Sequence, residues 1–405
     1  MPAPVIVAGA RTPIGKLLGG LSGLSAPELG GIAIRAALSR AGLSGEQVDA
    51  VVFGNVVQAG AGPNPARLAA ARGGIPMTVP AYTVNKLCLS GLTAIAQAAA
   101  QVASGYSSVV VAGGTESMSG APYLAPGARG GLKYGAGTFA DALDQDALTC
   151  GFDGLSMGAA TEKYQGPLGI SREDQDEFAA ASHAKAAAAI KDGRLAEEIV
   201  PVTIAGRKGD VIVESDEGVR PGTTAGQLGK LRAAFAAGGT ITAGSASQLS
   251  DGACAVVVTS REHASSLGLP VLAEIGAYGT VAGPDPSLLH QPARAIRDAL
   301  RRTPDGSLTV DDLDLVEINE AFAGVSLASS RELGIPADKL NVNGGAIALG
   351  HPVGMSGARV VLTLALELAR RGGGVGAAAL CGGGGQGDAL IIRVLSLFAT
   401  LMVTE

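Results

Sequence analysis

Residues 82–91 read YTVNKLCLSG, which is the pattern of a strand end, a turn and the start of a helix. An Ala-rich segment over residues 92–104 continues the helix. Cys88 falls at the turn, where the positive end of a helix dipole lowers the pKa of a thiol. The pattern makes Cys88 a candidate nucleophile, although free cysteine is also a common small core residue.

Alternating strand and helix patterns surround this stretch. Strands are predicted over residues 5–8, 48–57 and 108–112, and helices over residues 28–41 and 64–72. Gly42 is a plausible C-cap of the first helix. The run 108–112 is apolar throughout, which is typical of a strand buried on both faces of a sheet. The chain is therefore predicted to be an α/β protein.

The composition changes between residues 119 and 250, where glycine, proline and charged residues become more frequent. A long amphipathic helix is predicted inside this region over residues 171–193, with Ser171 as its N-cap and acids in its first turn. We interpret the region as an insertion packed over the main body.

Segments that precede the insertion recur after it, in the same order and at nearly constant spacing. The matching pairs are AIRAAL at 33–38 with AIRDAL at 295–300, DAVV at 49–52 with DLVE at 314–317, Ser90-Gly91 with Ser356-Gly357, and the buried run at 109–114 with that at 377–383. Coincidence in an Ala-rich chain is the alternative, but ordered matches favour two similar α/β halves. Two halves that face each other would bring equivalent turns together.

Composition limits the classes of function. A net charge of −6 and the lack of a basic, aromatic-studded stretch argue against nucleic acid as a partner. The four cysteines are far apart without a CxxC, so we expect neither a zinc site nor a redox pair, in a reducing compartment. The apolar run at 394–403 is about half the ~20 residues of a membrane span, and the N-terminus has a strand pattern rather than a signal peptide. We expect a soluble cytoplasmic protein.

Polar chemistry gathers at the turns that duplication would bring near Cys88. GHPVGMSG at 350–357 places His351 before a helix, where it could accept a thiol proton and leave a thiolate–imidazolium pair, or simply be a turn residue. CGGGGQG at 381–387 follows a buried strand, and its glycines allow backbone N–H groups to approach an oxyanion. The phosphate-binding alternative lacks the GxxxxGK[ST] and GxGxxG contexts. Asn319, in NEAF at 319–322, could hold a water or donate to an oxyanion, or only close a turn.

These motifs together resemble the thiolase family, and within it the acetyl-CoA acetyltransferases. The resemblance extends from GARTP at 9–13 to about residue 392. It implies the thiolase fold, with two duplicated βαβαβαββ halves in five layers, αβαβα, and an inserted loop domain. The implied domains are residues 1–118, completed by 251–270, then a CoA-binding loop domain at 119–250, and a C-terminal half at 271–405.

The resemblance also implies a two-step Claisen mechanism. His351 would activate Cys88, which takes an acyl group from an acyl-CoA. Cys381 would then remove the α-proton of acetyl-CoA, and the carbanion would attack the acyl-cysteine. One oxyanion hole would comprise His351 and a water held by Asn319, and the other the backbone N–H groups of Cys88 and Gly383.

Contacts with coenzyme A are implied at positions that match the family. Arg220 resembles an arginine that packs on the adenine, Phe235 and Ser247 resemble pantetheine contacts, and Met157 resembles a methionine of the acyl pocket. Lys208 could meet phosphates, but a solvated surface turn is an equal alternative.

Four residues depart from the family's usual pattern. Ser156 stands where many members carry His, and Ser245 replaces the Asn that is usual at its position. His290 begins the sequence HQP where the family commonly has Gly-x-Gly-Pro. Leu89 is larger than the residue that often follows the cysteine. We expect them to shape the acyl pocket, which leaves the acyl-chain preference open.

The main hypothesis is therefore an acetyl-CoA C-acetyltransferase that forms or cleaves acetoacetyl-CoA. The alternatives are a degradative 3-ketoacyl-CoA thiolase for longer chains and a non-catalytic acyl-CoA or lipid-binding relative. A ketosynthase is disfavoured because its second site residue is usually His, where this chain has Asn319 and Cys381. We expect acyl-CoA esters as substrates, no metal or redox cofactor, no nucleic-acid or membrane partner, and a homotetramer built as a dimer of dimers.

Overall fold

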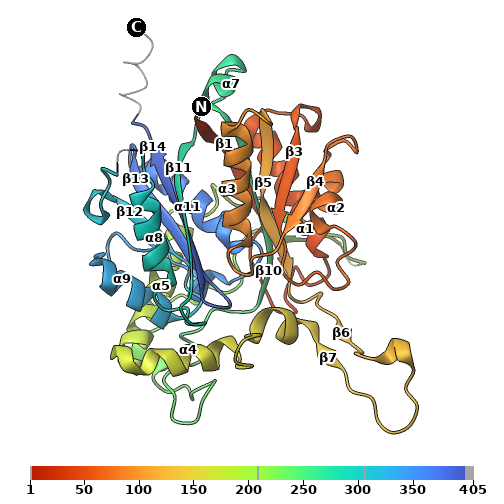
Figure 1. Cartoon of the computed structure of the whole chain (residues 1–405), viewed down its shortest axis with the longest axis vertical. Coiled ribbons are helices and arrows are strands. Elements are labelled where there is room, and N and C mark those ends of the chain that lie inside the picture. Colours follow the sequence, from red (N-terminus) through yellow and green to blue (C-terminus); the bar gives the residue numbers. More distant parts are fainter. Residues whose placement is uncertain (1, 208, 305, 397–405) are drawn as a thin grey trace.

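The computed structural model of the chain describes residues 2–207, 209–304 and 306–396, and it is a mixed α/β structure organised around one large sheet (Figure 1). The strands are β1 Pro4–Arg11, β2 Gly15–Lys16, β3 Ala50–Gly54, β4 Ala81–Val84, β5 Val109–Ser117, β6 Tyr123–Leu124, β7 Ala140–Asp141, β8 Val202–Ile204, β9 Val211–Val213, β10 Ser250–Ser260, β11 Ala273–Ala282, β12 Leu315–Ile318, β13 Gly374–Gly382 and β14 Gln386–Val394. The α-helices are α1 Ala26–Ala41, α2 Pro65–Arg72, α3 Ser90–Ala103, α4 Met157–Gln165, α5 Arg172–Lys191, α6 Ala225–Leu228, α7 Arg261–Ser266, α8 Gln291–Arg301, α9 Ala323–Leu333, α10 Ala346–Leu349 and α11 Ser356–Arg370.

The large sheet consists of two halves with the same strand order. From the junction outward, one half runs β1-β10-β5-β3-β4 and the other runs β11-β14-β13-β12. Leu340 adds a parallel bridge beside β12, at the place that β4 takes beside β3. The halves meet where β1 pairs with β11, Val5 opposite Glu274. The duplication predicted from recurring segments is therefore confirmed in the topology.

The helices form three layers around the two half-sheets. Helices α3 and α11 pack against each other and against strands of both halves, so they form the central layer (Figure 1). Helices α1 and α2 cover the outer face of the first half, and α8 covers that of the second. This arrangement has the five αβαβα layers of the thiolase fold, and the central layer brings the N-termini of α3 and α11 together.

Local signals explain most element boundaries. Ser171 caps α5 by accepting a hydrogen bond from the Asp174 N–H, as predicted. Gly42 closes α1 in the left-handed region at φ 69°. Strand β3 ends at Gly54, earlier than predicted, because the N–H groups of Val56 and Val57 leave the sheet and donate to the Glu116 carboxylate.

The segment between β5 and β10 lies across the end of the sheet at which α3 and α11 begin (Figure 1). It holds α4, α5 and α6 and the small hairpins β6–β7 and β8–β9. No helix among residues 2–207, 209–304 and 306–396 has the length and apolar character to span a membrane. The predictions for the tail at 397–405 lie outside the described residues.

Candidate active site

The turn that carries Cys88 joins β4 to α3. Leu87 adopts φ 52°, a left-handed conformation that is costly for a side chain of this size. Ser90, the first residue of α3, holds the turn: its hydroxyl accepts from the Lys86 N–H at 2.8 Å and donates to the Leu87 carbonyl at 2.6 Å. The strand–turn–helix pattern predicted around Cys88 is confirmed.

The turn before α11 fixes the tautomer of His351. The Ser356 hydroxyl donates to the Pro352 carbonyl at 3.0 Å, so its oxygen accepts from Nδ1 of His351 at 2.6 Å. A proton on Nδ1 leaves the lone pair of Nε2 free in the neutral ring. The amide nitrogen of Asn319 lies 3.4 Å from Nε2. His351 is therefore oriented to take a proton at Nε2.

Glu116 holds this turn against the first half of the molecule. Its buried carboxylate accepts from the Gly354 N–H at 2.9 Å and from the Val56 and Val57 N–H groups at 3.0 and 3.1 Å. Burial raises the pKa of Glu116 to about 7, although these N–H donors act in the opposite direction. β5 and the turn that carries His351 come so close that a Cβ on Gly114 would lie 1.9 Å from the Gly354 carbonyl oxygen. Glycine at position 114 of β5 thus allows the turn that carries His351 to pack against the first half of the molecule.

Cys381 lies near the end of β13, and Gly383 follows it in the turn that leads to β14. Cys381 pairs with Gly387 in the register of this hairpin. The N–H of Gly383 lies near enough to the Cys88 sulfur to lower the pKa of its thiol, and the Cys381 and Cys88 thiols are close enough to interact electrostatically. The structure thereby brings both thiols, the imidazole and the glycine loop together from the β4–α3 turn, the turn before α11 and the β13–β14 hairpin.

A cavity of about 470 Å³ opens over these groups. Its lining includes Cys88, Met157, Phe235, Ser247, His351, Cys381 and Gly383. Asn319 lies beside it through His351 and is fully buried. Phe235 packs edge-on against Phe322, another lining residue, with ring centroids 5.8 Å apart. An apolar wall around a few convergent polar groups is typical of a small-molecule site.

Burial shifts the proton affinities in opposite directions. Desolvation raises the pKa of Cys88 to about 11, and its own N–H and that of Gly383 only partly offset this. Desolvation, with the nearby Arg359, lowers the pKa of His351 to about 3. Burial also raises the pKa of Cys381. The lowered pKa predicted for the Cys88 thiol is therefore wrong: burial outweighs the helix dipole and favours the neutral thiol and the neutral imidazole.

Arg220 is the predicted contact that does not line the cavity. Its backbone N–H donates to Nδ1 of His183 and its Nη2 lies 3.2 Å from Nε2 of the same ring. His183 is fully buried, and sequence reasoning gave no signal for this pairing. Lys208 lies outside the described residues.

Three of the four departures from the family pattern lie away from the acyl pocket, which corrects the expectation. Leu89 is fully buried and packs against Gly382, Ser245 is buried against the Thr242 turn, and His290 pairs with Glu332 at 2.6 Å. Ser156 does line the cavity, and its hydroxyl caps α4.

Sequence reasoning missed the apolar wall of the cavity. The wall includes Met118, Ala147, Leu148, Leu249, Leu288 and Val353. These residues come from separate segments and, apart from Val353 in the 350–357 motif, belong to none of the quoted motifs, so only the packing identifies them as a wall. No group of three or more His, Cys, Asp or Glu side chains within the described ranges is arranged to hold a metal ion.

Comparisons with known proteins agree with this geometry. The thiolase N-terminal domain family matches residues 4–262, and the thiolase C-terminal domain family matches residues 269–394. A probable acetyl-CoA acetyltransferase of Mycolicibacterium smegmatis is 57% identical over 390 residues, which cover 96% of this chain and 100% of the relative. One of Mycobacterium tuberculosis is 57% identical, covering 97% of this chain and 100% of the relative. An acetyl-CoA acetyltransferase of Pseudomonas aeruginosa is 49% identical, covering 96% and 98%.

Proposed function

The chain belongs to the thiolase family, and from this premise we propose that it is an acetyl-CoA C-acetyltransferase. The reaction is the reversible Claisen condensation of two acetyl-CoA molecules to acetoacetyl-CoA and CoA through an acyl-cysteine. One observation carries the proposal: the cavity is lined by two thiols, an imidazole and the loop whose N–H reaches Cys88.

The first half-reaction transfers an acetyl group to Cys88. Nε2 of His351 takes the proton of Cys88 as the sulfur attacks the thioester carbonyl, so the charged pair forms only with the new bond. The backbone N–H groups of Cys88 and Gly383 stabilise the oxyanion. The C–S bond to CoA breaks, and the CoA sulfur takes the proton of Cys381. This leaves an acetyl-enzyme, a Cys381 thiolate and a protonated His351.

The second half-reaction forms the carbon–carbon bond. The Cys381 thiolate removes the α-proton of a second acetyl-CoA, which regenerates its thiol. Protonated His351 and a water on Asn319, whose Oδ1 has no protein partner among the described residues, stabilise the enolate oxygen. The carbanion attacks the acetyl carbonyl, Cys88 leaves as a thiolate, and His351 returns its proton. The cycle balances in protons and needs no metal or redox cofactor, since the thioester itself stabilises the carbanion.

Substrate binding is assigned to residues on the segment between β5 and β10. We place the pantetheine arm against Phe235 and Ser247 and the acyl group against Met157, all of which line the cavity. Arg220 would meet the adenine further out. The enzyme is proposed to act in the cytoplasm, in keeping with its four free cysteines, and to assemble as a homotetramer.

Thiolysis tests the proposed activity. The protein incubated with acetoacetyl-CoA and CoA should release acetyl-CoA, and the rate should fall along a series of 3-ketoacyl-CoA esters of increasing chain length. A rate that instead rises with chain length would establish the degradative thiolase. No thiolysis of any ester by the intact protein would rule out both activities.

A further inference from the structure

Lys86 stands two residues before the proposed nucleophile, yet its side chain reaches the other half of the molecule. Its ammonium group donates to Oδ1 of Asp388 at 2.7 Å and to Oγ1 of Thr280 at 2.9 Å, and it lies 3.3 Å from the Tyr278 hydroxyl. Lys86 follows β4, whereas these partners lie on β11 and β14. The contact therefore spans the two duplicated halves.

Asp388 is fully buried and accepts hydrogen bonds from both halves. Besides Lys86, the Thr93 hydroxyl on α3 donates to it at 2.8 Å and the Tyr278 hydroxyl donates at 2.7 Å. A buried carboxylate is stable only when it is paired and hydrogen-bonded, so this position strongly selects a cation at residue 86.

Each partner of the Lys86–Asp388 ion pair lies close to one of the two site thiols, Cys88 or Cys381. Asp388 follows Gly387, which pairs with Cys381 in the β13–β14 hairpin. The turn of this hairpin also carries Gly383, whose N–H lies near enough to the Cys88 sulfur to lower the pKa of its thiol. The pair thus joins the turn that bears one thiol to the hairpin that bears the other.

The remaining side-chain hydrogen bonds of the Cys88 turn stay inside the first half. Asn85 donates to the Val56 carbonyl at 3.2 Å and accepts from the Leu87 N–H, and Ser90 bonds within the turn. Of the side chains described in residues 85–90, Lys86 is the one that forms polar bonds with the second half. Apolar packing of Leu89 on Gly382 restrains the distance but not the direction of an N–H.

We propose that Lys86 and Asp388 are positioning residues that hold the Cys88 turn in register with the β13–β14 hairpin, so that the Gly383 N–H stays directed at the Cys88 sulfur. The left-handed Leu87 makes this turn prone to relax once the tie is cut. A displacement of about 1 Å at a reacting group can cost about 100-fold in rate.

The test measures alkylation of Cys88 by iodoacetamide, which does not depend on the proposed function, together with the KM and kcat of thiolysis, which do. Lys86→Met keeps the length of the side chain and removes its charge. It should slow alkylation about tenfold, because a lost N–H donor raises the pKa of the attacking thiol. It should lower kcat at least as much while KM changes little, since residue 86 does not line the cavity. Lys86→Arg should restore both.

Asp388→Asn separates positioning from a simple charge effect. If Lys86 acted only as a nearby cation, removing the opposing carboxylate would speed alkylation, because a less neutralised cation stabilises the thiolate. The positioning role predicts that alkylation slows in this variant too. Faster alkylation would overturn the proposal.

Arg261→Met is the matched control, since Arg261 pairs with Glu274 on β11 away from the cavity. It should leave alkylation and kcat unchanged. The proposal also fails if Lys86→Met lowers only the melting temperature and leaves alkylation and kcat as in this control. Slowed alkylation in a protein that shows no thiolysis even when unaltered would refute the proposed function and leave the positioning role intact.

Discussion

His351 shows how much of the chemistry is decided at a single side chain. The Ser356 oxygen holds the Nδ1 proton, and burial keeps the ring neutral with its pKa near 3. Because its pKa is this low, the imidazole takes a proton only when a negative charge forms beside it, as an attacking thiolate or enolate provides. Its low pKa delays proton transfer until substrate arrives and protects the resting thiol.

The burial of His351 predicts that the folded protein loses stability at acidic pH. The pKa of His351 is lowered from 6.5 to about 3, so between these values the unfolded chain binds a proton that the folded one does not, and stability falls as pH falls below 6.5. His351→Asn should remove this contribution. Between about pH 7.5 and about pH 5, the variant should lose about 2 kcal/mol less of its free energy of unfolding than the unaltered protein, measured in urea. An equal loss in both proteins would contradict the assigned burial.

For single residues, the sequence predicts where a side chain lies better than it predicts the pKa of that side chain. Cys88 could be placed at a strand–helix turn because that pattern is local. Its raised pKa could not be predicted, because the groups that exclude water, such as Met118 and Leu249, come from distant segments. A motif can therefore identify a reactive side chain, but its pKa can be assigned only when the residues packed around it are known.

Two elements meet at Leu89, the residue after the nucleophile. Leu89 precedes α3 and is fully buried, and a Cβ on Gly382 of β13 would lie 2.7 Å from its Cγ. The larger side chain is accommodated because the facing strand ends in glycine. Leu89 thus sets the distance between the Cys88 turn and the Cys381 strand rather than the width of the acyl pocket.

This packing predicts a non-additive pair of substitutions. Leu89→Ala should cost about 2–5 kcal/mol through the cavity it leaves, and Gly382→Ala should be destabilising through the clash. In the Leu89→Ala background, Gly382→Ala should cost less, with a coupling energy of about 0.5–3 kcal/mol in denaturant unfolding. Gly23→Ala, at a glycine with open space, is the control and should show no coupling. Strictly additive effects would refute the contact.

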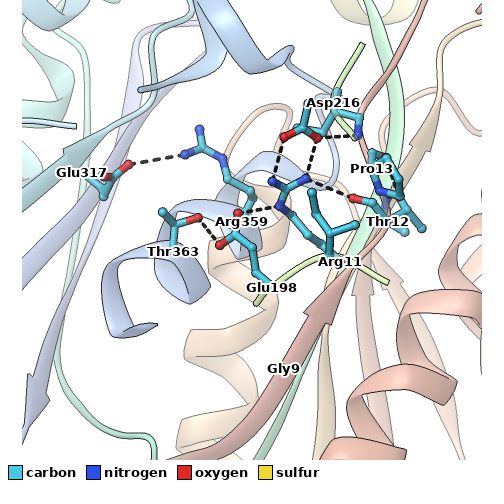
Figure 2. A network of polar contacts seen from close by, with 12 residues as sticks. Gly9, Arg11, Thr12, Pro13, Glu198, Asp216, Glu317, Arg359 and Thr363 are labelled. Carbon is cyan, nitrogen blue, oxygen red and sulfur yellow. Dashed lines mark hydrogen bonds and ion pairs between the residues drawn. The ribbon is translucent and has the colours of Figure 1, made fainter. Parts of the chain in front are cut away.

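At the scale of the whole molecule, a buried ionic network joins the inserted segment to both halves (Figure 2). Arg11 on β1 donates to Glu198 at 2.6 Å and to both oxygens of Asp216, while Thr363 on α11 donates to Glu198 at 2.8 Å. These charges raise the pKa of Arg11 despite its burial. The segment that carries the proposed CoA contacts is thereby anchored at residues 198 and 216.

Arg11→Met tests this anchor. The variant leaves two buried carboxylates without their cation, which should lower the free energy of unfolding by about 3–5 kcal/mol and expose the 198–216 segment to limited proteolysis. Arg331→Met removes a partly exposed partner of Asp174 and should change stability by less than about 1 kcal/mol. Equal stability and equal proteolysis in the two variants would argue against the anchor.

The overall fold could be predicted from the sequence where the two halves repeat the same pattern of segments. Ser90-Gly91 and Ser356-Gly357 marked equivalent helix starts, and both open helices of the central layer. The contact between Arg220 and His183, by contrast, depends on how the insertion folds back on itself, which no repeat or periodicity encodes. Local patterns and duplication predicted the scaffold, while side-chain partners across segments required the structure.

The central claim is that Cys88 carries the acyl group, and the mass of the protein after brief exposure to acetyl-CoA tests it most directly. The account predicts that one acetyl group is added, that peptide mapping places it on Cys88, and that free CoA removes it. Cys88→Ala should gain no acetyl group. An acetyl group located on another residue, or one that persists in Cys88→Ala, would contradict the account.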